Sequence, residues 1–270
     1  MNQWRDEKLP YLYELHSHTK VGSLCSSFEP EEYPQYYIEL GYSGMVVSDH
    51  FYHGNTSIDR SLEWRKFVDQ YSDGYRRAKE AGDKLGFSVF FGIEFRFKER
   101  NDEYIVLGFT PEWVADHPEL RNMGRDEFFD FVHANGGYVI QAHPFRKASY
   151  LSSITLVGDA VDAVEVFNSC NMPENCRQAY EYAKNLGLPM VGGSDIHHKS
   201  FSRQHSGIIT EEKLDSVEAL IEALKSGRYE IAPKGKLEEI AALPLEDPVL
   251  PVFRLNGKEL EETTDYYYSK

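Results

Sequence analysis

YLYELHSH, residues 11–18, joins an apolar and aromatic run to a pair of histidines. The run over residues 11–15 predicts a short buried strand. It ends abruptly at His16 and His18. Their i, i+2 spacing places both imidazoles on one face of an extended chain. The stretch therefore predicts a strand that delivers two metal-binding side chains to the same place.

Six further apolar runs follow the first, and helical patterns separate most of them. The apolar runs lie at 44–48, 88–95, 104–109, 138–142, 162–168 and 189–194. The helical patterns occupy 30–41, 61–86, 125–137, 172–187 and 216–227. Strands that alternate with helices are typical of βα units and a mostly parallel sheet. The seven runs therefore predict an α/β fold with enough strands to approach a barrel.

The whole chain, residues 1–270, is interpreted as a single domain. It contains no internal repeat, low-complexity tract or obvious linker that would divide it. The expected core covers about residues 10–240. The remainder, about residues 241–270, is rich in Pro, Glu and Tyr without a clear period, and is expected to form a C-terminal extension.

Charge and composition limit the classes of partner. The net charge of −15 repels polyanions, so an extended nucleic acid is not expected. No apolar run of about 18 residues and no signal-peptide pattern occur, which argues against a membrane span and against secretion. Three cysteines are too few, and odd in number, for a disulfide framework. Together these features predict a cytoplasmic protein, and they leave its oligomeric state open.

Residue types that bind metal ions cluster at five of the predicted strands. They are His16, His18, Asp49, His50, Glu94, His143, Asp195 and His197. The carboxyl ends of parallel barrel strands lie on one rim, so these side chains are expected to converge. Burying so many ionisable groups together without a cation costs several kcal/mol. The pattern therefore predicts a metal cluster at the rim.

The ligand types indicate the metal and the chemistry. Mixed imidazole and carboxylate ligands suit Zn, Mn or Fe better than Mg or Ca. Glu94 is a natural bridge between two ions. Two ions about 3.5–4 Å apart activate water and clamp the oxygens of a phosphoryl displacement. The site therefore favours metal-assisted hydrolysis.

Five short motifs occur in a fixed order between about residues 11 and 200: HSH, SDH, GIE, AHP and GSDIH. Taken together, they are similar to the motifs of the PHP family (polymerase and histidinol phosphatase). This resemblance implies a distorted seven-stranded (β/α) barrel. It also implies a phosphoesterase site with two or three divalent metal ions.

The resemblance also implies roles for single residues. His16, His18, Glu94 and Asp195 would hold the first metal ion. Glu94 and His143 would hold the second ion, and His50 and His197 would belong to the third. Asp49 precedes His50 as in the family, where it either binds a metal ion or orients a neighbouring ligand.

The chain departs from the family pattern at two places. Many members carry an acidic residue or a histidine seven or eight residues after the first His of the pair, where this chain has Ser23 and Leu24, followed by Cys25. Cys25 is interpreted either as a thiolate ligand or as a packed, inert side chain. Many members also carry a His before the strand that follows the Glu. Here Asp102 or Glu103 would have to replace it.

The predicted function is a metal-dependent phosphoesterase that hydrolyses small phosphate esters, either phosphomonoesters or nucleotides, with metal-activated water. Glu94, Asp195 and Arg146 are the candidate catalytic residues, with Arg146 binding phosphate. Asn168 is a candidate pocket residue, and His197 or His205 a candidate acid for the leaving group. The alternatives are a histidinol-phosphatase, a metallohydrolase of a non-phosphate bond, and a non-catalytic metal-binding scaffold.

Overall fold

The computed structural model describes residues 11–98, 100–148, 151, 154–199 and 205–245. Nine strands of these ranges form one sheet in the order β7-β6-β5-β4-β3-β2-β1-β8-β9. The strands are β1 (Tyr11–Glu14), β2 (Gly44–Val47), β3 (Ser88–Arg96), β4 (Glu103–Leu107), β5 (Tyr138–Gln141), β6 (Ala163–Asn168), β7 (Met190–Gly193), β8 (Gly207–Thr210) and β9 (Glu230–Ala232).

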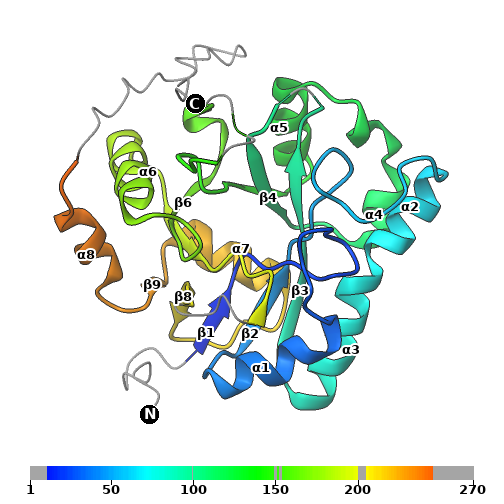
Figure 1. The fold of residues 1–270 in the computed structure, drawn as a ribbon, viewed down its shortest axis with the longest axis horizontal. Helices are drawn as coiled ribbons and strands as arrows, with labels where there is room; N and C mark the ends of the chain where they lie inside the picture. Colours follow the sequence, from blue (N-terminus) through cyan, green and yellow to red (C-terminus); the bar gives the residue numbers. More distant parts are fainter. Residues whose placement is uncertain (1–10, 99, 149–150, 152–153, 200–204, 246–270) are drawn as a thin grey trace.

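Helices surround the sheet (Figure 1). The α-helices are α1 (Tyr33–Glu39), α2 (Trp64–Tyr71), α3 (Asp73–Leu85), α4 (Pro111–Asp116), α5 (Arg125–Ala134), α6 (Pro173–Leu186), α7 (Val217–Ser226) and α8 (Lys236–Ala242). Short 3-10 helices occur at Pro30–Glu32, Pro118–Arg121 and Gly158–Ala160. None of the helices within the described ranges has both the length and the apolar character of a membrane span.

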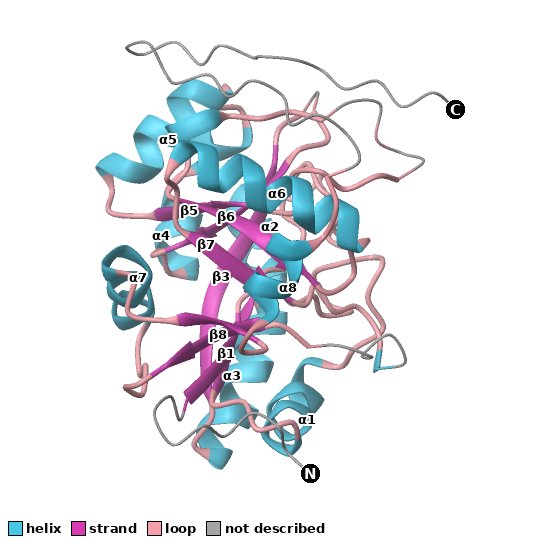
Figure 2. Ribbon diagram, turned by 90° about the vertical axis from the view of Figure 1, so that its left-hand side faces the viewer, coloured by secondary structure: helices cyan, strands magenta, loops and turns pink. Residues whose placement is uncertain are grey.

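The sheet curves, so that β5, β6 and β7 form one group and β8 and β1 another, with β3 running between them (Figure 2). Past the end of β7, the backbone N of Asp195 donates to the carbonyl of His16 at 2.8 Å. The backbone N of His18 donates in turn to the carbonyl of Ile196 at 3.1 Å. These bonds join the extension of β1 to that of β7. The result is a nearly closed barrel whose junction lies beside the histidine pair, so the α/β barrel prediction is confirmed.

Several details differ from the sequence-based prediction. The sheet has nine strands rather than seven, because two short strands, β8 and β9, continue it beyond β1 in antiparallel fashion. β4 is antiparallel to both β3 and β5. The helix expected over 61–86 is divided at Ser72 into α2 and α3. At this break Tyr71 donates its hydroxyl to the carbonyl of Asp49 at 2.5 Å.

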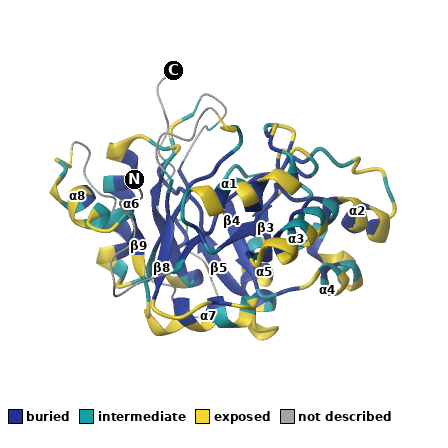
Figure 3. Ribbon diagram, turned by 90° about the horizontal axis from the view of Figure 1, so that it is seen from below, coloured by how far each residue is buried: buried dark blue, intermediate teal, exposed yellow. Residues whose placement is uncertain are grey.

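Residues alternate between the inside and the outside of the barrel. Phe90 lies in the same hydrophobic cluster as Tyr138 and Ala163, whereas its neighbour Phe91 belongs to the cluster that contains Trp64 of α2. The strands are buried on both faces, while the outer helices keep exposed surfaces (Figure 3). Successive residues of a strand point to opposite faces. A continuous apolar run therefore fills both the barrel interior and the layer between the strands and the outer helices.

α7 closes one end of the barrel. Its Leu220, Ile221 and Leu224 are buried in the same cluster as Phe90 and Tyr138, which lie near the beginnings of their strands. Burial of a side chain of this kind stabilises the fold by about 1.5–3 kcal/mol. The opposite end, where the parallel strands finish, is left for polar side chains. The expected C-terminal extension falls mostly on residues 246–270, outside the described residues.

Candidate metal centre

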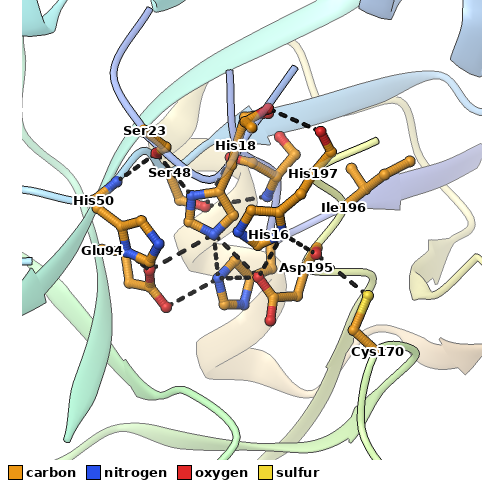
Figure 4. A network of polar contacts seen from close by, with 12 residues as sticks. His16, His18, Ser23, Ser48, His50, Glu94, Cys170, Asp195, Ile196 and His197 are labelled. Carbon is orange, nitrogen blue, oxygen red and sulfur yellow. Dashed lines mark hydrogen bonds and ion pairs between the residues drawn. The ribbon is translucent and has the colours of Figure 1, made fainter. Parts of the chain in front are cut away.

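The histidine pair after β1 forms the centre of the polar end. Nε2 of His16 and Nε2 of His18 lie 3.1 Å apart, and both side chains are fully buried (Figure 4). The backbone bonds to Asp195 and Ile196 keep this segment extended. The predicted placement of both imidazoles in one pocket is therefore what the structure shows.

Glu94 of β3 stands between the imidazoles. Its Oε1 lies 3.1 Å from Nε2 of His16 and 3.2 Å from Nε2 of His143. Its Oε2 lies 2.5 Å from Nδ1 of His50 and 3.6 Å from Nε2 of His18. One carboxylate thus reaches four imidazoles, which is the arrangement that a bridging ligand requires.

Asp195 and His143 both adopt backbone angles that are unusual for side chains with a Cβ. The φ of Asp195 is 54° and that of His143 is 28°. Such angles cost of the order of 1–3 kcal/mol each and concentrate at functional sites. Oδ1 of Asp195 lies 3.1 Å from Nε2 of His18 and 3.5 Å from Nε2 of His16. The strained backbone thus belongs to side chains that meet in the cluster.

Glu103, rather than Asp102, joins this cluster. Its carboxylate oxygens lie 3.6 Å from Nδ1 of His50 and 3.7 Å from Nε2 of His143. Glu103 is the first residue of β4, and because β4 is antiparallel its first residue lies at the rim where the parallel strands end. Asp102 instead accepts a hydrogen bond from the hydroxyl of Tyr104 at 2.6 Å.

Three histidines have their Nδ1 atoms fixed by neighbours. Nδ1 of His16 lies 3.0 Å from Oε1 of Glu165, and Nδ1 of His197 lies 2.7 Å from the carbonyl of Asp195. Both partners are acceptors, so Nδ1 carries the proton in each ring. Nδ1 of His18 lies 3.1 Å from the hydroxyl of Ser23, which itself donates to Asp49. Each ring therefore keeps the lone pair of Nε2 for a ligand.

Asp49 lies one step away from the cluster. Its oxygens accept hydrogen bonds from the backbone N and the hydroxyl of Thr19, both at 2.6 Å, and from Ser23 at 2.7 Å. The direct contacts of this carboxylate are thus to Thr19 and Ser23. Of the two roles open for Asp49, orientation of His18 through Ser23 is the one that these contacts serve.

Glu165 and Asn168 of β6 are linked to the cluster by hydrogen bonds. Oε2 of Glu165 accepts hydrogen bonds from the backbone N of His143 at 3.0 Å and from Nδ2 of Asn168 at 2.9 Å. Glu165 was not predicted as a site residue. The sequence could have indicated this role. Glu165 lies two residues after Ala163 in the strand, and Ala163 faces the barrel interior, so Glu165 is expected to face the interior as well.

Arg146 contacts Asp195 rather than standing free in the pocket. One of its guanidinium nitrogens forms an ion pair with Oδ2 of Asp195, and Nε donates to Oδ1 of Asn171 at 2.9 Å. The same group donates to Oδ1 of Asn168 at 3.2 Å. Arg146 thus positions Asp195, in addition to its predicted contact with phosphate.

A cavity of about 450 Å³ opens beside the cluster. Its lining includes Cys25, His50, Arg96, Glu103, Arg146 and His197. His205 does not line it. Nε2 of His205 lies 3.1 Å from the hydroxyl of Tyr36, and its ring packs edge-on against Tyr37 and Tyr42. The contacts of His205 are therefore with the tyrosines, and they give no support to a role as acid for the leaving group.

Neighbouring charges strongly shift the pKa values of side chains in the cluster. Burial disfavours charge on His16, but Asp195, Glu165 and Glu94 outweigh it and raise the pKa of this imidazole well above its usual value. Burial likewise opposes ionisation of Glu94, yet His50 and His16 hold its pKa well below the ordinary range. Burial, together with the charge of Glu94, raises the pKa of Glu103. Carboxylates and imidazoles of the cluster thus stabilise one another's charged forms, and a bound cation would take the place of the imidazole protons.

Divalent cations fit these side chains. Triads such as His16–His18–Glu94 and His50–Glu94–Glu103 bring one ligand atom each to within 4.8 Å of one another. Oε2 of Glu94 and Nδ1 of His50 are buried and close but lack hydrogen-bond geometry, so both are available to a third partner. Imidazole and carboxylate donors of this kind suit Zn, Mn and Fe.

The fold and the site define a barrel protein with a metal-binding rim, and comparison with known proteins agrees. Residues 173–229, which contain α6, Asp195, His197 and α7, match the PHP-associated family. The curated proteins give no match. The resemblance to the PHP family is thus confirmed in this part of the chain.

Two solved structures share the fold. One is a two-domain protein from Bacteroides vulgatus, described as containing a predicted PHP-like metal-dependent phosphoesterase. Its TM-score is 0.61 and its identity 16%, and the match covers 89% of this chain and 73% of that chain. The other is PsfC from Pseudomonas syringae, with a TM-score of 0.52, 14% identity, and coverage of 85% and 94%. These likenesses show a PHP-like fold.

Proposed function

We propose that this protein is a metal-dependent phosphoesterase that acts on small phosphate esters. The observation that carries the proposal is that metal-binding side chains and arginines border the same cavity. His50, Glu103 and His197 of the cluster line one part of the cavity, and Arg96 and Arg146 line the same space. Arginine in such a position favours an anionic substrate, and its planar fork suits a phosphoryl group.

The first ion would be held by His16, His18, Glu94 and Asp195. Glu94, Glu103 and His143 would hold a second ion, and His50 and His197 would contribute to a third. Bound divalent ions lower the pKa of water and stabilise charge on phosphoryl oxygens. The Bacteroides vulgatus protein, which is described as containing a predicted PHP-like metal-dependent phosphoesterase, supports this proposal.

The protein's own side chains orient these ligands and the substrate. Glu165 fixes the proton of His16 on Nδ1, and Ser23 fixes that of His18. Arg146 holds Asp195 while its guanidinium borders the cavity, so binding of a phosphate beside it is coupled to the position of a metal ligand. His197 also borders the cavity, and it is the candidate acid for the leaving group in the form of the protein that lacks the third ion.

The net charge of −15 supports a small substrate, because a long polyanion would meet repulsion beyond the two arginines. The predicted cytoplasmic location agrees with the free state of Cys25, Cys170 and Cys176. A histidinol-phosphatase, a non-phosphate metallohydrolase and a non-catalytic scaffold are the competing outcomes of the experiment.

The test is phosphate release by protein loaded separately with Mn²⁺, Zn²⁺ or Fe²⁺, from a panel of phosphomonoesters that includes nucleotides and histidinol phosphate. We expect release that is abolished by His16→Ala and retained by His133→Ala, a histidine that pairs with Asp162 away from the cavity. A preference for histidinol phosphate would identify the first alternative. Absence of release from every ester, with metal bound, would contradict the proposal.

A further inference from the structure

We propose that Glu14 is a positioning residue of the metal centre, whose carboxylate joins the backbone of His16 to the backbone next to Asp195. It thereby fixes the separation of two side chains that would hold the first ion. The inference rests on the metal binding that the proposed function requires, and it is independent of the substrate.

Glu14 is the last residue of β1, and its side chain is fully buried. Its Oε1 accepts one hydrogen bond from the backbone N of His16 at 2.9 Å and another from the backbone N of Ser194 at 2.7 Å. Glu14 and Ser194 are 180 positions apart in the chain. A single oxygen atom thus connects the segment that carries His16 to the segment that carries Asp195.

This carboxylate lies at the junction where the barrel closes. β1 and β7 are not neighbours in the strand order of the sheet, and just beyond their ends Ser17 and Ile196 form an isolated parallel bridge. The backbone N–H groups of His16 and Ser194 make their hydrogen bonds with Glu14 rather than with a partner strand. Removal of this acceptor leaves two buried donors unpaired, which is costly, so the junction is expected to distort.

Asp195 depends on such support because its backbone is strained. Its φ of 54° lies in the left-handed region, and this conformation persists only where the surrounding structure holds it. The bond between the backbone N of Ser194 and Glu14 fixes the residue before Asp195. The backbone N of Asp195 itself donates to the carbonyl of His16 at 2.8 Å. Together these bonds hold Oδ1 of Asp195 at 3.1 Å from Nε2 of His18.

Two tyrosines of α1 hold the same junction. The hydroxyl of Tyr37 donates to Oε2 of Glu14 at 3.0 Å. The hydroxyl of Tyr33 donates to the carbonyl of His18 at 2.6 Å and to that of Ile196 at 3.3 Å. The two tyrosine rings stack with their centroids 5.7 Å apart. Both oxygens of Glu14 are therefore bound, so the orientation of the carboxylate is fixed before an ion arrives.

A buried carboxylate at this position has a cost that packing alone does not explain. Tyr13 and Leu15, the neighbours of Glu14 in the chain, belong to a hydrophobic cluster of the barrel. The donors to Glu14 are two backbone N–H groups and a phenol, and all of them are neutral. Hydrogen bonds to a charged acceptor are roughly twice as strong as neutral ones, which offsets the burial of the charge. An anion is therefore suited to holding two backbone segments together.

The first experiment measures zinc affinity of the full chain by competition with a chelator. Glu14→Met keeps the approximate length of the side chain and removes both acceptor oxygens, whereas Glu14→Gln keeps an oxygen for the two backbone donors. We expect zinc affinity to fall roughly 10-fold or more in Glu14→Met, as for other groups that orient metal ligands, and by less than about threefold in Glu14→Gln.

The control for a general loss of stability is Leu224→Ala in α7, at the opposite end of the barrel. Urea unfolding without metal should show that Leu224→Ala and Glu14→Met are both less stable than the wild type. Only Glu14→Met should bind zinc more weakly. Unchanged zinc affinity in Glu14→Met, or an equal loss of affinity in Leu224→Ala, would overturn the proposal.

Hydrogen exchange of the metal-free wild type gives a second readout that needs no variant, so it applies even where Glu14→Met does not fold. The backbone amides of His16 and Ser194 should exchange at least about tenfold more slowly than that of Glu174, an exposed residue at the beginning of α6. Rapid exchange of both amides would show that Glu14 does not hold the junction before an ion binds, contrary to the proposal.

Neither readout involves hydrolysis, so the two proposals can fail separately. Weakened zinc binding by Glu14→Met, without phosphate release by the wild type, would retain the positioning role and reject the phosphoesterase. Phosphate release by the wild type, with unchanged zinc binding by Glu14→Met, would retain the phosphoesterase and reject the positioning role.

Discussion

His16 and His205 are histidines of one molecule in opposite chemical surroundings. His16 is fully buried at the barrel rim, 3.0 Å from Oε1 of Glu165 and 3.1 Å from Oε1 of Glu94. His205 is partly buried beside Tyr36, Tyr37 and Tyr42. Burial lowers the pKa of His205 to about 4, whereas the carboxylates around His16 outweigh burial and raise its pKa.

The comparison shows what makes a histidine a candidate ligand. Both residues lie near the histidine-rich motifs of the sequence, and both are shielded from water. Only His16 is surrounded by anions, which fix its tautomer and supply the other donors of a metal site. We call Tyr36, Tyr37 and Tyr42 around His205 the tyrosine cluster. The metal centre differs from it in having carboxylates near its histidines, and not in the presence of histidine itself.

The largest effect is expected from removing the central carboxylate. Glu94→Gln keeps the shape of the side chain but removes the charge that four imidazoles share. Loss of several kcal/mol of charge stabilisation should lower kcat/KM for phosphate release on the order of a thousandfold. Bound metal, measured by mass spectrometry after gel filtration, should fall in parallel.

The matched control for this variant is Glu174→Gln, on the exposed side of α6. It should keep both the metal content and the rate of the wild type. If Glu94→Gln retained full metal occupancy, the bridging role of this carboxylate would be wrong.

The second prediction concerns the tyrosine cluster. His205 has a pKa of about 4 in the fold and about 6.5 in the unfolded chain, so the unfolded state binds more protons between these values. The free energy of unfolding therefore rises with pH in this window and falls as the pH drops from 6.5 toward 4. The loss amounts to at most about 3 kcal/mol, because each pKa unit is worth about 1.4 kcal/mol.

Urea unfolding of His205→Gln at several pH values measures this contribution. The variant should lose less stability than the wild type on acidification. His133→Gln offers a control of opposite sign, because the hydrogen bond to Asp162 raises the pKa of His133. Its contribution is present below pH 6.5 and is lost as the pH rises through the raised pKa. Identical pH dependence for the wild type and His205→Gln would show that the tyrosine cluster does not shield this ring.

The smallest effect is expected from the carboxylate behind His16. Glu165→Gln removes a charge but keeps an oxygen that can accept from Nδ1 of His16, and Glu165→Ala removes both. Zinc affinity, measured by competition with a chelator, should fall roughly 10-fold in the first variant and toward 100-fold in the second. Unchanged affinity in both variants would mean that His16 needs no anionic support.

Most of the barrel could be predicted from the sequence. The seven expected strands are all present, because each is a run of apolar residues flanked by turn residues or polar side chains. β8 and β9 were not among the expected strands. The break at Ser72 was missed as well, because the buried positions of α2 continue into α3 through Gly74 and Ala78 at helical spacing.

The sequence by itself determined the local features of this protein: the strands, the order of the motifs, and the pairing of His16 with His18. These features depend on residues that are close together in the chain. They can therefore be recognised from the two-residue spacing of strands and the roughly four-residue spacing of helices. Seven of the eight predicted metal ligands meet in the structure, while Asp49 bonds to Thr19 and Ser23.

Only the tertiary structure decided which distant groups complete the site. Glu103 reaches the rim because β4 runs antiparallel, which places the beginning of that strand beside the ends of its neighbours. Glu165 of β6 comes to His16 after β1 through barrel closure. Strand direction and closure depend on contacts between residues far apart in the chain, and no local period encodes them.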